Sequence, residues 1–207
     1  MGNTEPNLKI KTIVVGYLET NCYLVGDSKG DAVVIDPGGS PDRILFEIDK
    51  NFYRPFCILL THSDSDHIGG LDGVLRNRQA PVLMHRKELD FLRMPKTRIS
   101  RFPGKVPAEP GYYALEDGDV VEADGWGLTV LFTPGHTPGG VCYRLGDVVF
   151  TGDTLFSDGV GRTDFEGGSE EALTQSIYGR LLTLEDSVKI YPGHGPPSTI
   201  GRERRQF

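Results

Sequence analysis

Histidine and aspartate residues stand in this sequence at spacings that suit a metal site. Four of them fall within the run Thr61–His67, and three more stand singly downstream, each directly after a glycine. The seven residues are His62, Asp64, Asp66, His67, His136, Asp153 and His194. Imidazole and carboxylate groups are ligands that divalent transition metals select, and seven of them can hold two ions. We therefore predict a site for one or two metal ions.

Apolar, strand-like runs precede each part of this set and should position it. The run 57–60 leads into Thr61–His67, and the runs 127–133, 147–151 and 188–191 lead to His136, Asp153 and His194. Strand ends that share one edge can gather distant side chains into one pocket. If 62–66 is extended, its alternate side chains project to one side. The adjoining glycines let the backbone turn sharply there.

The order of the expected elements predicts the architecture. In the first half we expect strands at 8–17, 20–25, 32–36, 57–60 and 82–84, with helices after Ser40-Pro41, at 67–77 and at 86–93. In the second half we expect strands at 118–123, 127–133, 141–145, 147–151 and 188–191, with one helix capped by Ser169. Two packed sheets with helices outside fit this order. Residues 94–111 are expected to form an irregular surface loop, a domain linker being the alternative.

Composition narrows the class of protein. The 207 residues suit a single domain over 1–207, and a net charge of −7 argues against broad nucleic-acid binding. No apolar stretch is long enough to cross a membrane, and the first residues show no secretory signal. Three cysteines, an odd number within strand-like runs, are expected to be buried thiols. We expect a cytoplasmic protein, and the sequence leaves a homo-oligomer open.

The spacing of the seven residues resembles the metallo-β-lactamase superfamily, whose motif is His-x-His-x-Asp-His followed by a later His, Asp and His. Within it the chain is similar to the small bacterial hydrolases of the glyoxalase II-like group. The segments that carry this likeness are Thr20–Leu24, Val34–Gly38, Gly161–Phe165 and Pro192–Pro196. The resemblance implies an αββα four-layer sandwich with the metals at one edge.

The resemblance also implies how the ligands divide. One metal position would use His62, residue 64 and His136, and the other would use Asp66, His67 and His194. Asp153 would bridge both. Position 64 departs from the family, which has histidine where this chain has Asp64. Zinc is the first expectation for the metal. An oxygen ligand at position 64 makes that metal position harder and more hospitable to iron or manganese, which are the alternatives.

The activity that the resemblance implies is hydrolysis of a small thioester of the hydroxyacylglutathione type. A metal-bound hydroxide would attack the carbonyl carbon, and Asp66 would orient it. The alternative is a persulfide dioxygenase of the same fold, with one iron held by His62, His136 and Asp153. A β-lactamase is disfavoured by the lack of an export signal. A non-enzymatic, metal-poor binding protein that lost activity through Asp64 is a further alternative.

Other polar residues give weaker indications of a role in substrate binding or in support of the site. Two basic stretches could attract an anionic small-molecule substrate, although solvated charge is the simpler interpretation. They contain Arg93, Lys96, Arg98, Arg101 and Lys105, and Arg202, Arg204 and Arg205. His85 is expected to be structural or to support the site indirectly. Asp36 is expected to support the site or cap a turn, and Arg162 and Asp164 to form a structural pair.

Overall fold

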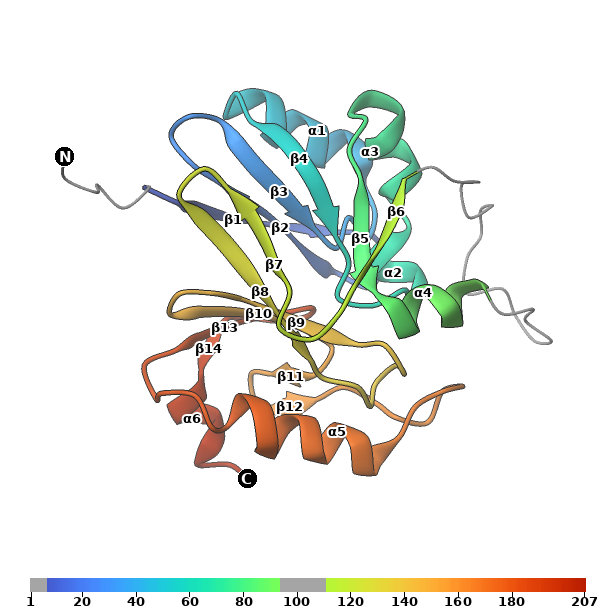
Figure 1. Ribbon diagram of the computed structural model, residues 1–207, viewed down its shortest axis with the longest axis vertical. Helices are drawn as coiled ribbons and strands as arrows, with labels where there is room; N and C mark the ends of the chain where they lie inside the picture. Colours follow the sequence, from blue (N-terminus) through green and yellow to red (C-terminus); the bar gives the residue numbers. More distant parts are fainter. Residues whose placement is uncertain (1–6, 94–110) are drawn as a thin grey trace.

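Two mixed six-stranded β-sheets, stacked face to face, form the centre of the molecule (Figure 1). This computed structural model describes residues 7–93 and 111–207. In spatial order, the first sheet contains β1 (Lys9–Val15), β2 (Thr20–Gly26), β3 (Asp31–Ile35), β4 (Arg54–Leu59), β5 (Val82–His85) and β6 (Tyr112–Leu115). The second contains β14 (Ser198–Thr199), β13 (Lys189–Pro192), β10 (Val148–Gly152), β9 (Val141–Leu145), β8 (Trp126–Phe132) and β7 (Val120–Ala123). A separate hairpin pairs β11 (Leu155–Phe156) with β12 (Gly159–Val160).

Helices lie on the outer side of each sheet, so the layers run α, β, β, α (Figure 1). Beside the first sheet are α1 (Pro41–Lys50), α2 (Ser65–Ile68), α3 (Leu71–Asn77) and α4 (Arg86–Arg93). Beside the second are α5 (Glu170–Ser176), the π-helix η1 (Ile177–Leu181) and α6 (Ile200–Arg204). The αββα sandwich predicted from the sequence is confirmed.

Three layers of buried apolar side chains hold these four layers together. Successive strand residues point to opposite faces, so Leu24 packs toward the helices while Val25 packs toward the second sheet. A third cluster joins β9, β10 and β13 to α5 and η1, with Leu173 and Ile177 facing Val149. Because most central strands are covered on both faces, their sequences are almost continuously apolar.

The helix expected at 67–77 is in fact two helices, so that prediction is wrong. The chain is helical from Ser65 to Ile68, breaks at Gly69-Gly70, and resumes at Leu71. The Gly70 amide donates to the Pro37 carbonyl at 2.8 Å. A Cβ at Gly69 would lie 2.8 Å from the Gly38 oxygen. The break therefore lets the loop after β3 approach the backbone beside α2.

The two predicted helix caps have different outcomes. Ser169 caps α5 as expected, because its Oγ accepts a hydrogen bond from the Ala172 amide at 3.2 Å. Ser40 precedes α1 but does not cap it with its side chain. Its φ is +47°, and its Oγ accepts a hydrogen bond from the Gly16 amide at 3.3 Å instead. Pro41 does occupy the first turn of α1.

The remaining expected strands and the helix at 86–93 are present, whereas β6, β11, β12, β14 and α6 were not predicted. Several of these are only two residues long, which is too short to show a periodicity. The surface loop was expected at 94–111, and its residues 94–110 lie outside the described part of the chain. The single domain over 1–207 stays a prediction. In residues 7–93 and 111–207 no helix has the length and apolarity needed to cross a lipid bilayer.

Candidate metal site

Seven side chains, which we call the His/Asp cluster, meet at one end of the sandwich. The first half of the chain supplies His62 and Asp64 from the loop after β4, and Asp66 and His67 from α2. The second half supplies His136 from the loop between β8 and β9, Asp153 directly after β10, and His194 after β13. The structure thus brings together all seven residues named from the sequence. The condition that the run 62–66 be extended is met only in part, because α2 already begins at Ser65.

The cluster divides into overlapping groups of three. The first group contains His62, Asp64 and His136, and the second group contains Asp66, His67 and His194. A further combination joins His62, His67 and Asp153. Within each set, one ligand-type atom per residue lies within 4.8 Å of the others. Such spacing suits one ion per group.

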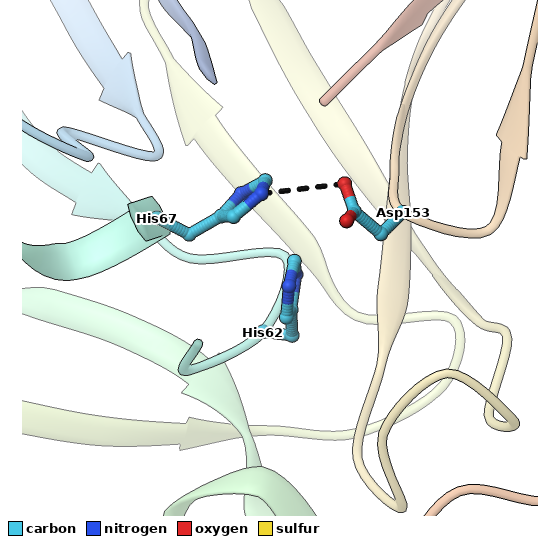
Figure 2. Close-up of side chains that lie close together, drawn as sticks. All are labelled: His62, His67 and Asp153. Carbon is cyan, nitrogen blue, oxygen red and sulfur yellow. Dashed lines mark ion pairs between the residues drawn. The ribbon is translucent and has the colours of Figure 1, made fainter. Parts of the chain in front are cut away.

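Asp153 lies between the two groups. Its Oδ1 is 3.3 Å from His67 Nε2, and its Oδ2 is 3.7 Å from both His136 Nε2 and His194 Nε2. Figure 2 shows the His67 ring and the Asp153 carboxylate pointing at each other, with the His62 ring beside them. The carboxylate therefore faces both groups, which is the placement that a bridging ligand requires.

Several buried atoms of the cluster have no hydrogen-bond partner within the described part of the chain. They are the Nε2 atoms of His62, His67 and His136, and Oδ1 of Asp153. Three of them do face an oppositely charged group, His67 Nε2 and Asp153 Oδ1 facing each other at 3.3 Å and His136 Nε2 facing Asp64 Oδ2 at 3.4 Å. Buried polar atoms in folded proteins almost always form hydrogen bonds, so four atoms that form none in one cluster need an explanation. Imidazole nitrogen and carboxylate oxygen both donate electron pairs to a divalent cation. These residues therefore fit a metal ion.

The opposite ring nitrogens, by contrast, all have partners. His136 Nδ1 donates to the Arg162 carbonyl at 2.7 Å, and His194 Nδ1 lies 3.1 Å from the Leu18 carbonyl. His67 Nδ1 lies 2.9 Å from Asp36 Oδ2, and His62 Nδ1 is 3.0 Å from Thr61 Oγ1. A carbonyl or carboxylate beside Nδ1 keeps the proton there and leaves the Nε2 lone pair free. Metal-ligating histidines have this arrangement.

Asp36 lies beside the cluster and supports it through hydrogen bonds. Its carboxylate accepts hydrogen bonds from the Thr61 amide at 2.8 Å and the Thr61 hydroxyl at 2.6 Å. It also faces His67 Nδ1, and its own φ is +50°. One buried carboxylate thus orients His67 and the residue before His62. Two roles were expected for Asp36 from the sequence, support of the metal site or capping of a turn. This geometry fits support of the site.

The electrostatics of the cluster favour positive charge inside it. Burial alone would lower the pKa of His67, but the carboxylates of Asp153 and Asp36 outweigh burial and raise that pKa well above its usual value. Burial would raise the pKa of Asp153, but His67, His62 and His136 hold it far below its usual range. Without a metal, the neighbouring carboxylates favour a proton on His67. A bound divalent ion would replace that proton.

The sequence pattern of the metallo-beta-lactamase superfamily matches residues 15–194. The chain belongs to this superfamily. Among its relatives, the probable metallo-hydrolase YqgX of Bacillus subtilis is 36% identical over 204 residues, which is 96% of each chain. Hydroxyacylglutathione hydrolase GloC of Haemophilus influenzae is 35% identical over 204 residues, again 96% of each chain.

Solved structures agree with this membership. The B3 metallo-beta-lactamase BLEG-1 superposes with a TM-score of 0.86 at 34% identity, covering 95% of this chain and 97% of that one. TTHA1623, solved in a di-iron-bound form, gives 0.79 at 34% identity and covers 94% and 97%. ETHE1 from Myxococcus xanthus gives 0.79 at 31% identity and covers 95% and 82%. The metallo-β-lactamase fold binds divalent metals, and the His/Asp cluster stands ready for them.

One side of this metallo-β-lactamase site is open to solvent. The side chains of His194 and Asp66 are 26% and 20% exposed, whereas that of His67 is completely covered and that of His136 is 7% exposed. The ring of Phe156 lies edge-on to His194 at 6.1 Å between centroids. A substrate would therefore reach the second group first.

Glycines beside the cluster act in two ways. Gly135 and Gly152 have φ values of +140° and +48°, so they turn the backbone as expected from the sequence. Gly193 acts through close approach instead. A Cβ there would lie 2.2 Å from Asp153 Oδ1 and 2.7 Å from His67 Cε1. The loop that carries His194 can thus reach the cluster only with a glycine at 193.

Sequence reasoning did not single out three residues that hold the cluster in place. Thr20 Oγ1 donates to Asp66 Oδ2 at 3.1 Å. Asn21 Nδ2 donates to the Pro192 carbonyl at 3.0 Å and the Gly195 carbonyl at 2.8 Å, on either side of His194. Glu88, on α4, is fully buried. Thr20 and Asn21 belong to the segment Thr20–Leu24 that carried the resemblance. Nothing in the sequence around Glu88 marks it as a residue that supports the site.

Other residues considered from the sequence lie apart from the cluster. His85 stacks on Phe132 with centroids 4.1 Å apart, and belongs to none of the metal-type groups of the described chain. Arg162 forms two hydrogen bonds of 2.7 Å with Asp164, the structural pair that was expected. Arg202 pairs with Asp158, and Arg204 with Asp186, so this tail is docked on the fold. Lys96, Arg98, Arg101 and Lys105 lie outside the described residues.

Proposed function

We propose that the protein is a metal-dependent hydrolase of small thioesters of the hydroxyacylglutathione type. The observation that carries the proposal is the set of buried imidazole Nε2 atoms that gather around Asp153 without forming a hydrogen bond. Membership in a superfamily of metallo-hydrolases supports it, and so does the 35% identity to the hydroxyacylglutathione hydrolase GloC. Zinc is the first metal we expect, with iron or manganese as alternatives.

Each group would hold one ion, and Asp153 would contact both. Divalent ions held there would supply an activated water for attack and a positive charge opposite the oxyanion that forms on the thioester. The side chains around the cluster fix the orientation of its ligands. Four Nδ1 contacts orient the imidazole rings, and Asp36 fixes the peptide before His62. Because the covered side of the cluster excludes water, the attack would come from the open side.

Asp66 is the residue we propose for handling the proton and orienting the nucleophile. Burial would raise the pKa of Asp66, but a hydrogen bond from His194 and the charge of His67 lower it overall, so the group is anionic at neutral pH. Its Oδ2 lies 3.1 Å from His194 Nε2 and 3.1 Å from Thr20 Oγ1. It is partly exposed, so it can meet both a water and the substrate.

The test is a thioester panel that includes S-lactoylglutathione, assayed with protein loaded with zinc, iron(II) or manganese. Turnover of at least one member supports the proposal, and no turnover with a filled site contradicts it. Asp66→Asn should lower kcat by about 10²–10⁴-fold if Asp66 handles the proton. Asp147→Asn is the matched control, because Asp147 is exposed and precedes the opposite end of β10.

The alternative reaction is a persulfide dioxygenase with one iron at His62, His136 and Asp153. The observation that favours it is Asp64, which replaces the expected histidine and leaves only two imidazoles in the first group. Oxygen uptake with glutathione persulfide, compared with thioester cleavage by the same iron-loaded sample, separates the two reactions. An anionic small-molecule substrate, the absence of a nucleic-acid or membrane partner, a homo-oligomer and a cytoplasmic location remain predictions.

A further inference from the structure

A buried glutamate joins the two loops that carry the first group. Glu88 belongs to α4, an element that supplies no residue of the His/Asp cluster, and its side chain is fully covered. Its Oε1 accepts hydrogen bonds from the Ser63 amide at 2.8 Å and the Ser63 hydroxyl at 2.6 Å. Its Oε2 accepts from the Thr137 hydroxyl at 2.8 Å and the Gly139 amide at 3.1 Å.

The partners of Glu88 stand beside cluster residues. Ser63 lies between His62 and Asp64, and Thr137 directly follows His136. A single carboxylate therefore fixes both loops of the first group, one from each half of the sandwich. Two backbone amides and two hydroxyls from these loops converge on its two carboxylate oxygens.

The contact between Glu88 and the second loop is tight. A Cβ at Gly139 would lie 2.0 Å from the Glu88 amide nitrogen and 2.5 Å from its Cβ. The loop after His136 therefore packs directly on the first turn of α4. A buried carboxylate costs free energy unless it is hydrogen-bonded, and the hydrogen bonds that satisfy Glu88 all come from these two loops.

We propose that Glu88 is a positioning residue that sets the distance between His62, Asp64 and His136 and thereby the metal affinity of the first group. The inference deepens the proposed function and rests on its metal site. It does not require that the substrate be a thioester.

The informative variant is Glu88→Gln, which keeps the size of the side chain. Each carboxylate oxygen accepts from one backbone amide, and an amide cannot reverse its role as a hydroxyl can. The NH₂ group of glutamine must therefore face either the Ser63 amide or the Gly139 amide, and that bond is lost. One loop of the first group is released while most of the packing stays.

The matched control is Glu203→Gln. Glu203 is also fully buried on a short helix, and it accepts hydrogen bonds from the Asp158 amide at 2.9 Å and from the Ser198 hydroxyl. Neither partner adjoins a residue of the cluster in sequence. Both variants should lower the melting temperature, but only Glu88→Gln should change metal binding.

The experiment measures zinc affinity of the metal-stripped full-length chain by competition with a chelator, beside the melting temperature of the zinc-loaded protein. We expect Glu88→Gln to weaken at least one zinc-binding step by about tenfold, as changes around metal ligands commonly do. Glu203→Gln should stay within about twofold of the wild type, since it touches no ligand loop. Unchanged zinc affinity in Glu88→Gln, or an equal loss in both variants, would overturn the proposal.

If Glu88→Gln does not fold, Thr137→Val carries the test, because it removes one donor to Oε2 and keeps the carboxylate. A fall in zinc affinity supports the positioning role, and an unchanged affinity overturns it. Wild-type protein that binds zinc but cleaves no thioester would contradict the proposed reaction only. Wild-type protein that binds none of zinc, iron(II) and manganese would contradict both proposals.

Discussion

Removal of the metal from the loaded protein should lower its melting temperature by about 5–11 °C. Four buried atoms of the His/Asp cluster have no hydrogen-bond partner among the described residues. An unsatisfied buried polar atom costs about 1–3 kcal/mol. Because His67 Nε2 faces Asp153 and His136 Nε2 faces Asp64 as ion pairs, the full cost of about 1–3 kcal/mol falls on His62 Nε2. A bound ion relieves part of this cost, because it gives the lone pairs a partner.

The size of the shift follows from mass action. A ligand present at 100 times its Kd stabilises the folded state by about 2.7 kcal/mol. For a chain of 150–250 residues, each 1 kcal/mol moves the melting temperature by about 2–4 °C. The product is about 5–11 °C, and the required 2.7 kcal/mol lies within the cost of about 1–3 kcal/mol estimated above.

Differential scanning calorimetry of the metal-loaded and chelator-treated protein measures the shift, with metal analysis of both samples. His67→Gln should lose most of the metal-dependent shift, because His67 reaches both Asp153 and Asp66. His85→Gln should keep it, because His85 is the histidine outside the cluster. A shift below about 1 °C, in samples whose metal has demonstrably been removed, would refute the reasoning.

Three further predictions concern single substitutions. Gly193→Ala should abolish stoichiometric metal binding, because its Cβ would meet Asp153 Oδ1 at 2.2 Å; normal metal content by elemental analysis would contradict this. Asp64→His should raise the ratio of zinc to manganese bound at equal free concentrations, since imidazole replaces a harder ligand; an unchanged ratio would show that residue 64 is no ligand. Burial lowers the pKa of His85 below 6.5, so stability is lost as pH falls below 6.5, where the unfolded chain binds the extra proton. Metal-loaded His85→Gln should therefore lose less stability than wild type between pH 7.5 and 5.5 in urea unfolding, and an equal loss would exclude His85 as a contributor.

The four-layer architecture was predictable because its strands are apolar on both faces. The fully buried β2 and the buried end of β4 could be recognised from composition alone. The break between α2 and α3 could not, since the residues on both sides keep a helical periodicity. That break is imposed by the backbone of Pro37-Gly38, which is distant in sequence. Local propensity does not contain such a contact.

The cluster itself was predictable because metal-ligand residues are chemically distinctive and stood at strand ends. The residues that hold the cluster in place were harder to predict from the sequence. Asp36 and Asn21 fell in segments that resembled the family, but Glu88 lies in a short helix whose other polar residues are exposed. A single buried glutamate on an amphipathic helix has the sequence of a surface residue. Only the packing of the loop at Gly139 on α4 reveals its role.

Each group of the cluster takes residues from both halves of the sandwich. The first group joins His62 and Asp64 to His136, and the second joins Asp66 and His67 to His194. A metal ion held by either group would therefore cross-link the two halves of the sandwich rather than join residues of one loop.

This placement predicts which strands metal binding should protect from hydrogen exchange. Hydrogen–deuterium exchange of the chain with and without zinc should show added protection in both β4 and β13, because local opening of the strands that lead to the ligands must first release the ion. A peptide from β1, which lies at the far edge of the first sheet, provides the comparison and should change less. Protection confined to the peptide that contains Thr61–His67 would show that the ion does not join the two halves.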